Sequence, residues 1–335
     1  MMQALELIAL RGPDGLRLGE RPVPSHEGMV VIETHAAGVC FPDLLMSRGK
    51  YQVSPQLPAV MGQEVAGRVL EAPRGSRFSP GDRVWALLES GGHAEVVAAP
   101  PERTFALPDD VDYVDGAALG VNYLTSAFAL HRRGDLRAGE SILVLGAAGG
   151  LGTAMVGMAR AMGAVVHAVV STDDKVATAR EAGAHQVYVG DGFRDAVMAT
   201  TGGRGVDCVA DIVGGDLTVQ AVRSTRPEGR VLVLGFTNGI GAVPSNRLLL
   251  RNVSLVGAGM GPLMAHVPDL LTGLSVTVVE ALAAGLRPLI DSTFPLARGA
   301  EALRRMEDRE ARGKLVLQVR SDTRETAEPA LTGGQ

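Results

Sequence analysis

The sequence predicts an α/β protein in which a doubly wound, parallel-sheet domain is inserted into a β-rich domain. Three observations carry this prediction. Short alternating apolar runs broken by turns fill residues 1–120, longer strand-and-helix units follow from about residue 122, and the C-terminal run "GKLVLQV" again has the pattern of a strand. That last strand has no evident partner except the first domain, so we expect the middle of the chain to be an insertion.

The first part of the chain has the pattern of a mostly β domain. The runs "GMVVIETHAAGV" and "QEVAGRVLEA" are strand-like, and "RGPDG", "PVPSHEG" and "FSPGDR" are typical of turns between strands.

The stretch "LVLGAAGGLGTAMVGMARAMGA", residues 143–164, is the most informative in the sequence. Its first residues predict a strand buried on both faces, and Met155, Met158 and Met162 recur at helical spacing. Glycines at three-residue intervals in between would let a dinucleotide diphosphate approach the backbone at a helix N-terminus. A plain βα turn is the alternative. The candidate cofactor-binding residues of this turn are Ala148, Gly149, Gly150, Leu151 and Gly152.

Further elements follow in order. Strands are expected at "AVVHAVV" (164–170), "VDCVADIV" (206–213) and "RVLVLG" (230–235), with helices between them, and "NVSLVGAGM" (252–260) is expected to be the last strand of this sheet. One helix, "VPDLLTGLSVTVVEALAAG", and a final pair of strands should complete the fold. We therefore expect a β-rich domain at 1–121 and 261–320, a dinucleotide-binding domain at 122–260 and a flexible tail at 321–335.

The composition limits the classes of molecule that this protein is expected to bind. The formal net charge is −5 and no basic run occurs, which argues against a nucleic acid or an anionic membrane. No long apolar segment predicts a transmembrane helix, and "MMQALELIALRGPDG" lacks the pattern of a secretory leader, so we expect a cytoplasmic protein. The two cysteines, Cys40 and Cys208, are expected to be reduced there.

Several motifs, together with the glycine turn, give the chain a family resemblance over about residues 3–319. They are "AAGVCFPDLLMSRGKYQ" (36–52), "LPAVMGQEVAGRV" (57–69), "PGDRVWA" (80–86), "GGHAEVV" (91–97), "GAALGVNYLTSAFAL" (116–130) and "GKLVL" (313–317). With these motifs the sequence resembles the medium-chain dehydrogenase/reductase superfamily, and most closely its zinc-free quinone oxidoreductase, or zeta-crystallin-like, branch. The resemblance implies a GroES-like β-rich catalytic domain, a Rossmann doubly wound parallel-sheet domain, and a homodimer formed through the strand at 252–260.

The branch is indicated by metal ligands that this chain replaces. The resemblance implies that zinc alcohol dehydrogenases have a Cys at the position of Cys40, a His at that of Gln63 and a second Cys near Val121. Only one of the three remains, and zinc requires several sulfur, nitrogen or carboxylate ligands. We therefore expect no metal site.

The same resemblance supplies candidate catalytic residues. Asp43 and Tyr51 match positions along the substrate cleft, where Tyr51 could bind or protonate an acceptor oxygen, but a helix-capping Asp and a half-buried Tyr are the alternatives. Cys40 is either a reactive thiol beside the nicotinamide or a buried apolar side chain. The residues expected beside the nicotinamide are Thr125, Gly235 and Phe236, although a buried Phe is also ordinary core.

Cofactor choice depends on the end of the second strand, "VVSTDDK". Val170 occupies the position where NAD-binding folds place an acid, whereas Ser171 and Lys175 could receive a 2′-phosphate. This favours NADPH. Asp173 and Asp174 could serve NAD if the strand ended later, or they could be first-turn charges of the next helix.

Without a Lewis-acid metal, reduction of an electron-poor acceptor is favoured over alcohol oxidation. The leading hypothesis is an NADPH-dependent quinone oxidoreductase that acts on a small electrophilic acceptor. The alternatives are an enone, alkenal or enoyl-thioester reductase of the same fold, and an NADPH-binding protein with little turnover.

Overall fold

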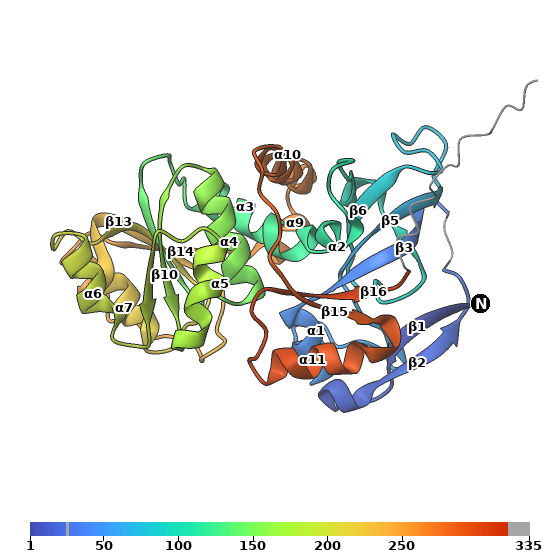
Figure 1. The fold of residues 1–335 in the computed structure, drawn as a ribbon, viewed down its shortest axis with the longest axis horizontal. Helices are drawn as coiled ribbons and strands as arrows, with labels where there is room; N and C mark the ends of the chain where they lie inside the picture. The colour runs from blue at the N-terminus through green and yellow to red at the C-terminus, as the bar shows by residue number, and fades with distance from the viewer. Residues whose placement is uncertain (25–26, 321–335) are drawn as a thin grey trace, which may run out of the picture.

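The computed structural model describes residues 1–24 and 27–320, which form two lobes side by side (Figure 1). One lobe contains the parallel sheet and the other contains both ends of the described chain. The expected flexible tail, residues 321–335, lies outside the described residues.

The β-rich lobe contains an antiparallel and mixed sheet in the order β15-β16-β3-β5-β6-β8, with β7 paired to β3, and a smaller sheet β2-β1-β4. Its strands are β1 (Met2–Leu7), β2 (Leu16–Arg21), β3 (Val30–Val39), β4 (Ala59–Val60), β5 (Glu64–Glu71), β6 (Arg83–Leu87), β7 (Val96–Ala99), β8 (Thr104–Ala106), β15 (Ile290–Pro295) and β16 (Lys314–Gln318). Its α-helices are α1 (Phe41–Ser47), α2 (Tyr113–Gly116) and α11 (Gly299–Glu307), and short 3-10 turns occupy Gly12–Gly15, Pro101–Arg103 and Leu296–Arg298.

The C-terminal strand β16 joins the first domain, as the sequence predicts. It lies antiparallel to β3, with Leu315 opposite Val39 and Leu317 opposite Ala37, and parallel to β15. The middle of the chain is therefore inserted between β-rich segments that share one sheet.

The inserted lobe contains a six-stranded parallel sheet in the order β11-β10-β9-β12-β13-β14. Its strands are β9 (Ser141–Leu145), β10 (Val165–Val170), β11 (Gln186–Val189), β12 (Val206–Asp211), β13 (Thr225–Val233) and β14 (Ser254–Gly257). The helices are α3 (Leu124–Ala127), α4 (Gly150–Ala161), α5 (Val176–Glu181), α6 (Phe193–Thr200), α7 (Leu217–Ser224), α8 (Ser245–Leu249), α9 (Met260–Met264) and α10 (Leu270–Ala283), with π-helical turns at Leu119–Tyr123 and Phe128–Arg133 and a 3-10 turn at Asp173–Lys175.

Strand β9 shows why this sheet needs helices on both faces. Ile142 and Val144 belong to the core shared with α4, whereas Leu143 and Leu145 belong to the core shared with α6 and α7. A strand that is buried on both sides is typical of a doubly wound fold. The prediction of such a sheet is confirmed, and β14 lies at its edge as expected.

The expectation of a single helix after residue 260 is wrong. The structure has α9, α10 and α11 in this region. Helix α11 has the sequence "GAEALRRME", in which only Gly299, Ala302 and Leu303 are buried. So narrow an apolar stripe among charged residues is a weak signal for a helix, which explains the omission.

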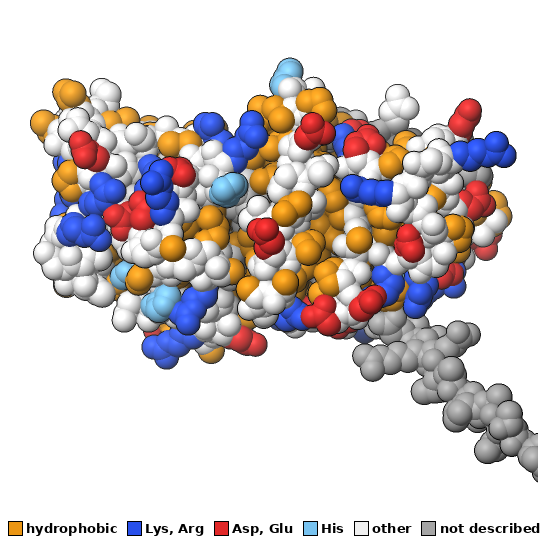
Figure 2. Space-filling model, turned by 90° about the horizontal axis from the view of Figure 1, so that it is seen from above, with side chains coloured by type: hydrophobic (Ala, Val, Ile, Leu, Met, Phe, Trp, Pro, Cys, Tyr) orange, Lys and Arg blue, Asp and Glu red, His pale blue; other side chains and the backbone are white. Residues whose placement is uncertain are grey.

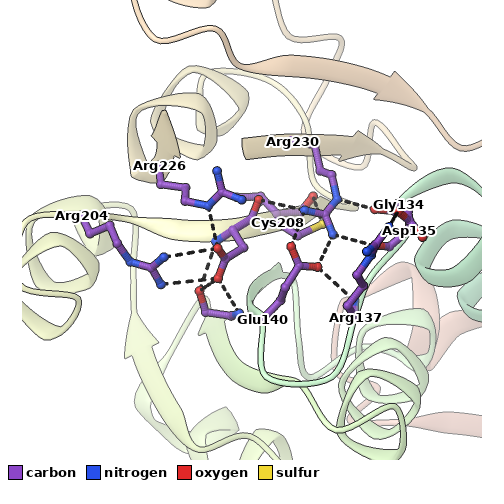
Figure 3. A network of polar contacts seen from close by, with 11 residues as sticks. Gly134, Asp135, Arg137, Glu140, Arg204, Cys208, Arg226 and Arg230 are labelled. Carbon is purple, nitrogen blue, oxygen red and sulfur yellow. Dashed lines mark hydrogen bonds and ion pairs between the residues drawn. The ribbon is translucent and has the colours of Figure 1, made fainter. Parts of the chain in front are cut away.

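A charged network joins the strands at the amino-terminal edge of the parallel sheet (Figure 3). Asp207 accepts hydrogen bonds from the Ser141 backbone N–H at 2.7 Å and from Arg226 Nε at 2.6 Å, and Arg230 donates to Glu140 at 3.0 Å. Burial acts to raise the pKa of Asp207, but the bonds from Ser141 and Arg226 outweigh it and hold that pKa well below its usual range. Ligands bind at the opposite, carboxyl-terminal edge of such sheets, so this network stabilises the fold.

In the described parts of the chain, no helix is long and apolar enough to cross a membrane. On the face shown in Figure 2, Lys and Arg side chains are interspersed with Asp and Glu, and hydrophobic side chains gather towards the middle.

Candidate active site at the junction of the two lobes

The glycine turn follows β9 directly and leaves an open backbone surface. Gly146 has φ of 73°, a conformation that favours glycine, and a Cβ on Gly152 would lie 2.1 Å from the Gly146 carbonyl oxygen. At Gly149, by contrast, the nearest atom to a Cβ would be 3.7 Å away. The N-cap residue of α4 is Gly149, which has no side chain that could cap the first turn. The turn is therefore tightly packed between Gly146 and Gly152 and open at Gly149, which suits a diphosphate held by backbone N–H groups.

Two segments contact this turn, one from each lobe. Gly313 forms a parallel bridge with Gly149, and a Cβ on Gly150 would lie 2.9 Å from Asn122 Nδ2 and 3.3 Å from the Gly313 oxygen. Asn122 is 8% exposed and belongs to a π-helical turn, an irregularity that is frequent at functional sites. The glycine turn is thus part of the junction between the lobes.

The loop after β10 brings together the two residues expected to receive a 2′-phosphate. The strand ends at Val170, and Lys175 Nζ donates to Ser171 Oγ at 3.2 Å. Asp173 and Asp174 lie in the 3-10 turn that leads into α5, which agrees with the interpretation of these acids as first-turn charges.

Two arginines from the other lobe, Arg309 and Arg312, also reach this loop, and sequence reasoning missed both. Lys175 Nζ donates to the Arg309 carbonyl at 3.2 Å, and Arg309 Nη2 donates to the Thr237 carbonyl at 3.4 Å. Arg312 forms an ion pair with Asp174. They stand in "EDREARGK", just before β16, and no local pattern relates that segment to residues 171–175.

The residues expected at the nicotinamide are less tightly held. Gly235 follows β13, and its N–H donates to the Asp211 carbonyl at 3.3 Å. Phe236 is 54% exposed, so its alternative interpretation as a core residue is wrong. Thr125 lies on α3 and is half-buried, three residues after Asn122.

A buried cluster of Cys40, Glu64 and Lys314 lies close to the glycine turn. Cys40 Sγ donates to Glu64 Oε1 at 3.0 Å, Lys314 Nζ donates to Cys40 Sγ at 3.2 Å and also forms an ion pair with Glu64, and Val121 N–H donates to Glu64 Oε2 at 2.6 Å. Val121 precedes Asn122 and Lys314 follows Gly313, so the two segments that contact the glycine turn also hold this cluster. Glu64 and Lys314 were missed; "GQE" and "GKLVL" contain them, but the pairing spans most of the chain.

The charge state of this cluster follows from its burial. Burial, followed by the Glu64 carboxylate, raises the pKa of the Cys40 thiol well above its usual value. Burial acts to lower the pKa of Lys314, but its contacts with Cys40 and Glu64 outweigh that effect and raise it. Lys314 therefore stays charged in its ion pair with Glu64, and Cys40 remains a protonated, buried thiol, which favours its packing interpretation over the reactive one.

Asp43 and Tyr51 have different surroundings. Asp43 is buried and accepts from the Cys40 N–H at 2.8 Å and the Gly62 N–H at 3.3 Å, so it caps α1 and fixes the loop at Gly62. Burial raises its pKa. Tyr51 is half-buried against a small core cluster with Met61, and within the described residues its hydroxyl makes no hydrogen bond.

Two of the three positions that the resemblance relates to zinc ligands, Cys40 and Val121, meet at Glu64, and the third is occupied by Gln63. Gln63 donates to the Glu89 carbonyl at 3.4 Å, Val121 contributes its backbone, and the Lys314 ammonium already contacts Cys40. Over residues 1–24 and 27–320, no three His, Cys, Asp or Glu side chains gather as a metal site would require.

Family models match both lobes. Residues 26–109 match the alcohol dehydrogenase GroES-like domain, and residues 150–274 match the family described as zinc-binding dehydrogenase.

Full-length relatives agree with these matches. The chain is 35% identical to quinone oxidoreductase-like protein 2 of Bos taurus over 306 residues, which cover 90% of this chain and 87% of the relative. A probable oxidoreductase from Mycobacterium abscessus has a similar structure, with a TM-score of 0.88, 42% identity and coverage of 95% and 98% of the two chains. A quinone oxidoreductase from Thermus thermophilus, solved also in complex with NADPH, has a TM-score of 0.83 and 33% identity, with coverage of 95% and 100%.

Proposed function

Because the chain belongs to the quinone oxidoreductase branch of the medium-chain dehydrogenase/reductase superfamily, we propose that it transfers a hydride from NADPH to a small quinone without a metal ion. Membership of this family supports an oxidoreductase activity. The identity of the cofactor, the identity of the acceptor and the independence from metal each depend on particular residues.

The observation that carries the proposal is the pairing of an open glycine turn with Ser171 and Lys175 at the end of β10. Gly149 leaves room for a diphosphate, and Ser171 and Lys175 offer a hydroxyl and a cation just after Val170, where an NAD site would have an acid. The NADPH complex of the Thermus thermophilus relative supports the same cofactor. The residues present therefore fit NADPH.

When bound, NADPH would supply the hydride, and the protein would position the cofactor and the acceptor and exclude water from them. The backbone at Gly149–Gly150 would hold the diphosphate, and Thr125 and Gly235 would border the nicotinamide. Phe236, which projects from the surface beyond β13, would cover the ring from water. Tyr51 would bind the acceptor oxygen through its unengaged hydroxyl.

Independence from metal is supported by what surrounds Cys40. A zinc ion there would need to displace the Lys314 ammonium from the thiol and from Glu64, and Gln63 and Val121 would offer no anionic or imidazole ligand. An acceptor that is already electron-poor needs little Lewis acidity, so a quinone suits this site better than an alcohol.

Assembly and location are further parts of the proposal. Strand β14 leaves one edge of the parallel sheet open, and an open edge invites pairing with a second copy. We expect a homodimer there. Cys40 and Cys208 are both free and buried, which is compatible with a reducing, cytoplasmic location.

The acceptor is tested by mixing the purified protein with NADPH and a panel of quinones, enones and enoyl thioesters and following absorbance at 340 nm. We expect the quinones to be reduced with the highest kcat/KM. Faster reduction of enones or enoyl thioesters would support those alternatives instead, and binding of NADPH without oxidation by any acceptor would indicate a protein with little turnover.

A further inference from the structure

The loop that would meet the 2′-phosphate is unfavourable for an anion when considered alone. Residues 171–175 contain one cation, Lys175, and two acids, Asp173 and Asp174, so the segment has a net negative charge. A phosphate monoester carries about −1.5 to −2 charges at neutral pH. A loop of this composition would repel the group that distinguishes NADPH from NADH.

The other lobe offsets this charge. Arg312 forms an ion pair with the Asp174 carboxylate and also donates to the Asp174 carbonyl at 3.4 Å. With Arg312 counted, the net negative charge of the loop is cancelled. A hydrogen bond from Thr172, followed by the Arg312 guanidinium, lowers the pKa of Asp174, so this carboxylate is ionised beside Arg312.

Stability does not account for this ion pair. Both side chains are about half exposed, at 45% for Arg312 and 53% for Asp174, and exposed pairs contribute little to folding. The backbone instead holds Arg312 in place. Its N–H donates to Asp291 Oδ1 at 2.9 Å, and the next residue, Gly313, bridges to Gly149.

We propose that Arg312 is a specificity-determining residue, which neutralises Asp174 from the opposite lobe and so lets the loop at 171–175 accept a 2′-phosphate. Freed from Arg312, Asp174 would repel that phosphate and could accept a hydrogen bond from an unphosphorylated ribose. Selection of the cofactor thereby depends on contact between the lobes. This inference rests on the proposed NADPH specificity.

The test measures binding, because catalysis would add other causes. Adenosine 2′,5′-bisphosphate and 5′-AMP are titrated by calorimetry into the wild type, Arg312→Gln, Asp174→Asn and the double variant. The matched control is Arg304→Gln. Arg304 lies on the same C-terminal segment as Arg312, is also partly exposed and also pairs with an acid, Asp14.

Arg312→Gln should weaken the bisphosphate by about 5- to 30-fold, as expected for one or two uncompensated unit charges near the surface, and leave 5′-AMP nearly unchanged. Adding Asp174→Asn should restore most of the loss. Arg304→Gln should change neither ligand. If Arg312 touches the phosphate directly, the double variant will stay weak, and the inference is overturned.

Failure of the inference and failure of the proposed function give different results. A wild type that prefers the bisphosphate, with an Arg312→Gln variant that binds it equally well, overturns the inference alone. A wild type without any preference for the bisphosphate overturns both.

Discussion

At the scale of single residues, Lys175 is the side chain that we propose to bind the cofactor's 2′-phosphate. It is held between Ser171 Oγ and the Arg309 carbonyl and remains partly exposed. A hydrogen bond between charged groups contributes about 1.5–3 kcal/mol, so Lys175→Ala should raise the Kd for NADPH by roughly 10- to 150-fold, near the lower end because of the exposure.

NADH serves as the internal control in this experiment. It lacks the phosphate, so its Kd should change little in Lys175→Ala. Titration of both cofactors by nicotinamide fluorescence gives the comparison, and equal weakening of the two would show that Lys175 does not recognise the phosphate.

The buried pair of Glu64 and Lys314 makes a second residue-scale prediction. Removing one partner leaves the other charge buried and unpaired, so Lys314→Met should lower the free energy of unfolding by about 3–5 kcal/mol. The double variant Glu64→Gln with Lys314→Met should be more stable than Lys314→Met alone. Urea denaturation measures both, and a double variant that is the less stable of the two would contradict the charge assignment.

Local sequence patterns indicated some of these residues and not others. Ser171 and Lys175 lie four residues apart in one loop, and the end of β10 at Val170 was readable from the sequence. Arg309 and Arg312 contact the loop at 171–175 in the other lobe, and Lys314 forms an ion pair with a carboxylate of its own lobe, all more than 130 positions away along the chain. Only the topology establishes these relations. The catalytic roles expected for Asp43 and Cys40 came from position alone, whereas burial and hydrogen bonding decide what such groups can do.

At the scale of elements, the amino-terminal edge of the parallel sheet depends on Asp207. Its pKa is depressed in the fold, so its contribution to stability is fully present above the unfolded-state pKa of about 3.9 and is lost progressively as pH falls below that value and through the lower folded-state pKa. Asp207→Asn should lower the free energy of unfolding by about 1.5–3 kcal/mol at pH 7.

Denaturation across a pH series checks this prediction. The difference between Asp207→Asn and the wild type should shrink as the pH is lowered below about 4. Asp195→Asn is the control, because Asp195 is 85% exposed and pairs with Arg194 at the surface. A difference that stays constant with pH would argue against a charged Asp207 as the cause.

Elements with strong periodicity were predictable and those without it were not. Strands β9, β10 and β12 are buried on both faces, so their runs stand out in the sequence, and the glycine turn lies where the pattern changes from strand to helix. Strand β11 is short and partly exposed, and it was missed. Helix α11 is mostly polar and was missed. The position of its following loop, which carries the arginines at the cofactor site, was therefore also unforeseen.

At the scale of the whole molecule, the proposed dimer depends on the open edge at β14. Leu255 on this strand and the neighbouring Leu249 and Leu250 are exposed. Leu255→Lys should abolish pairing, because a charge on an edge strand blocks its extension. Light scattering at micromolar concentration should give twice the chain mass of 34.8 kDa for the wild type and a single chain for the variant.

A matched substitution separates this effect from general damage. Leu70 is likewise exposed, but it lies on β5 in the other lobe, so Leu70→Lys should remain dimeric. A wild type with the mass of one chain would contradict the proposed dimer.

The central claim for the whole molecule is that hydride passes from NADPH to a quinone at the junction of the two lobes without a metal ion. The most direct measurement is a single turnover of the chelator-treated protein with 1,4-benzoquinone, followed at 340 nm with NADPH and with NADPH deuterated on each face of C4 in turn. Oxidation should proceed after chelation, and deuterium on one face alone should slow it. Oxidation that stops on chelation and returns with zinc, or that is slowed by deuterium on neither face, would contradict the claim.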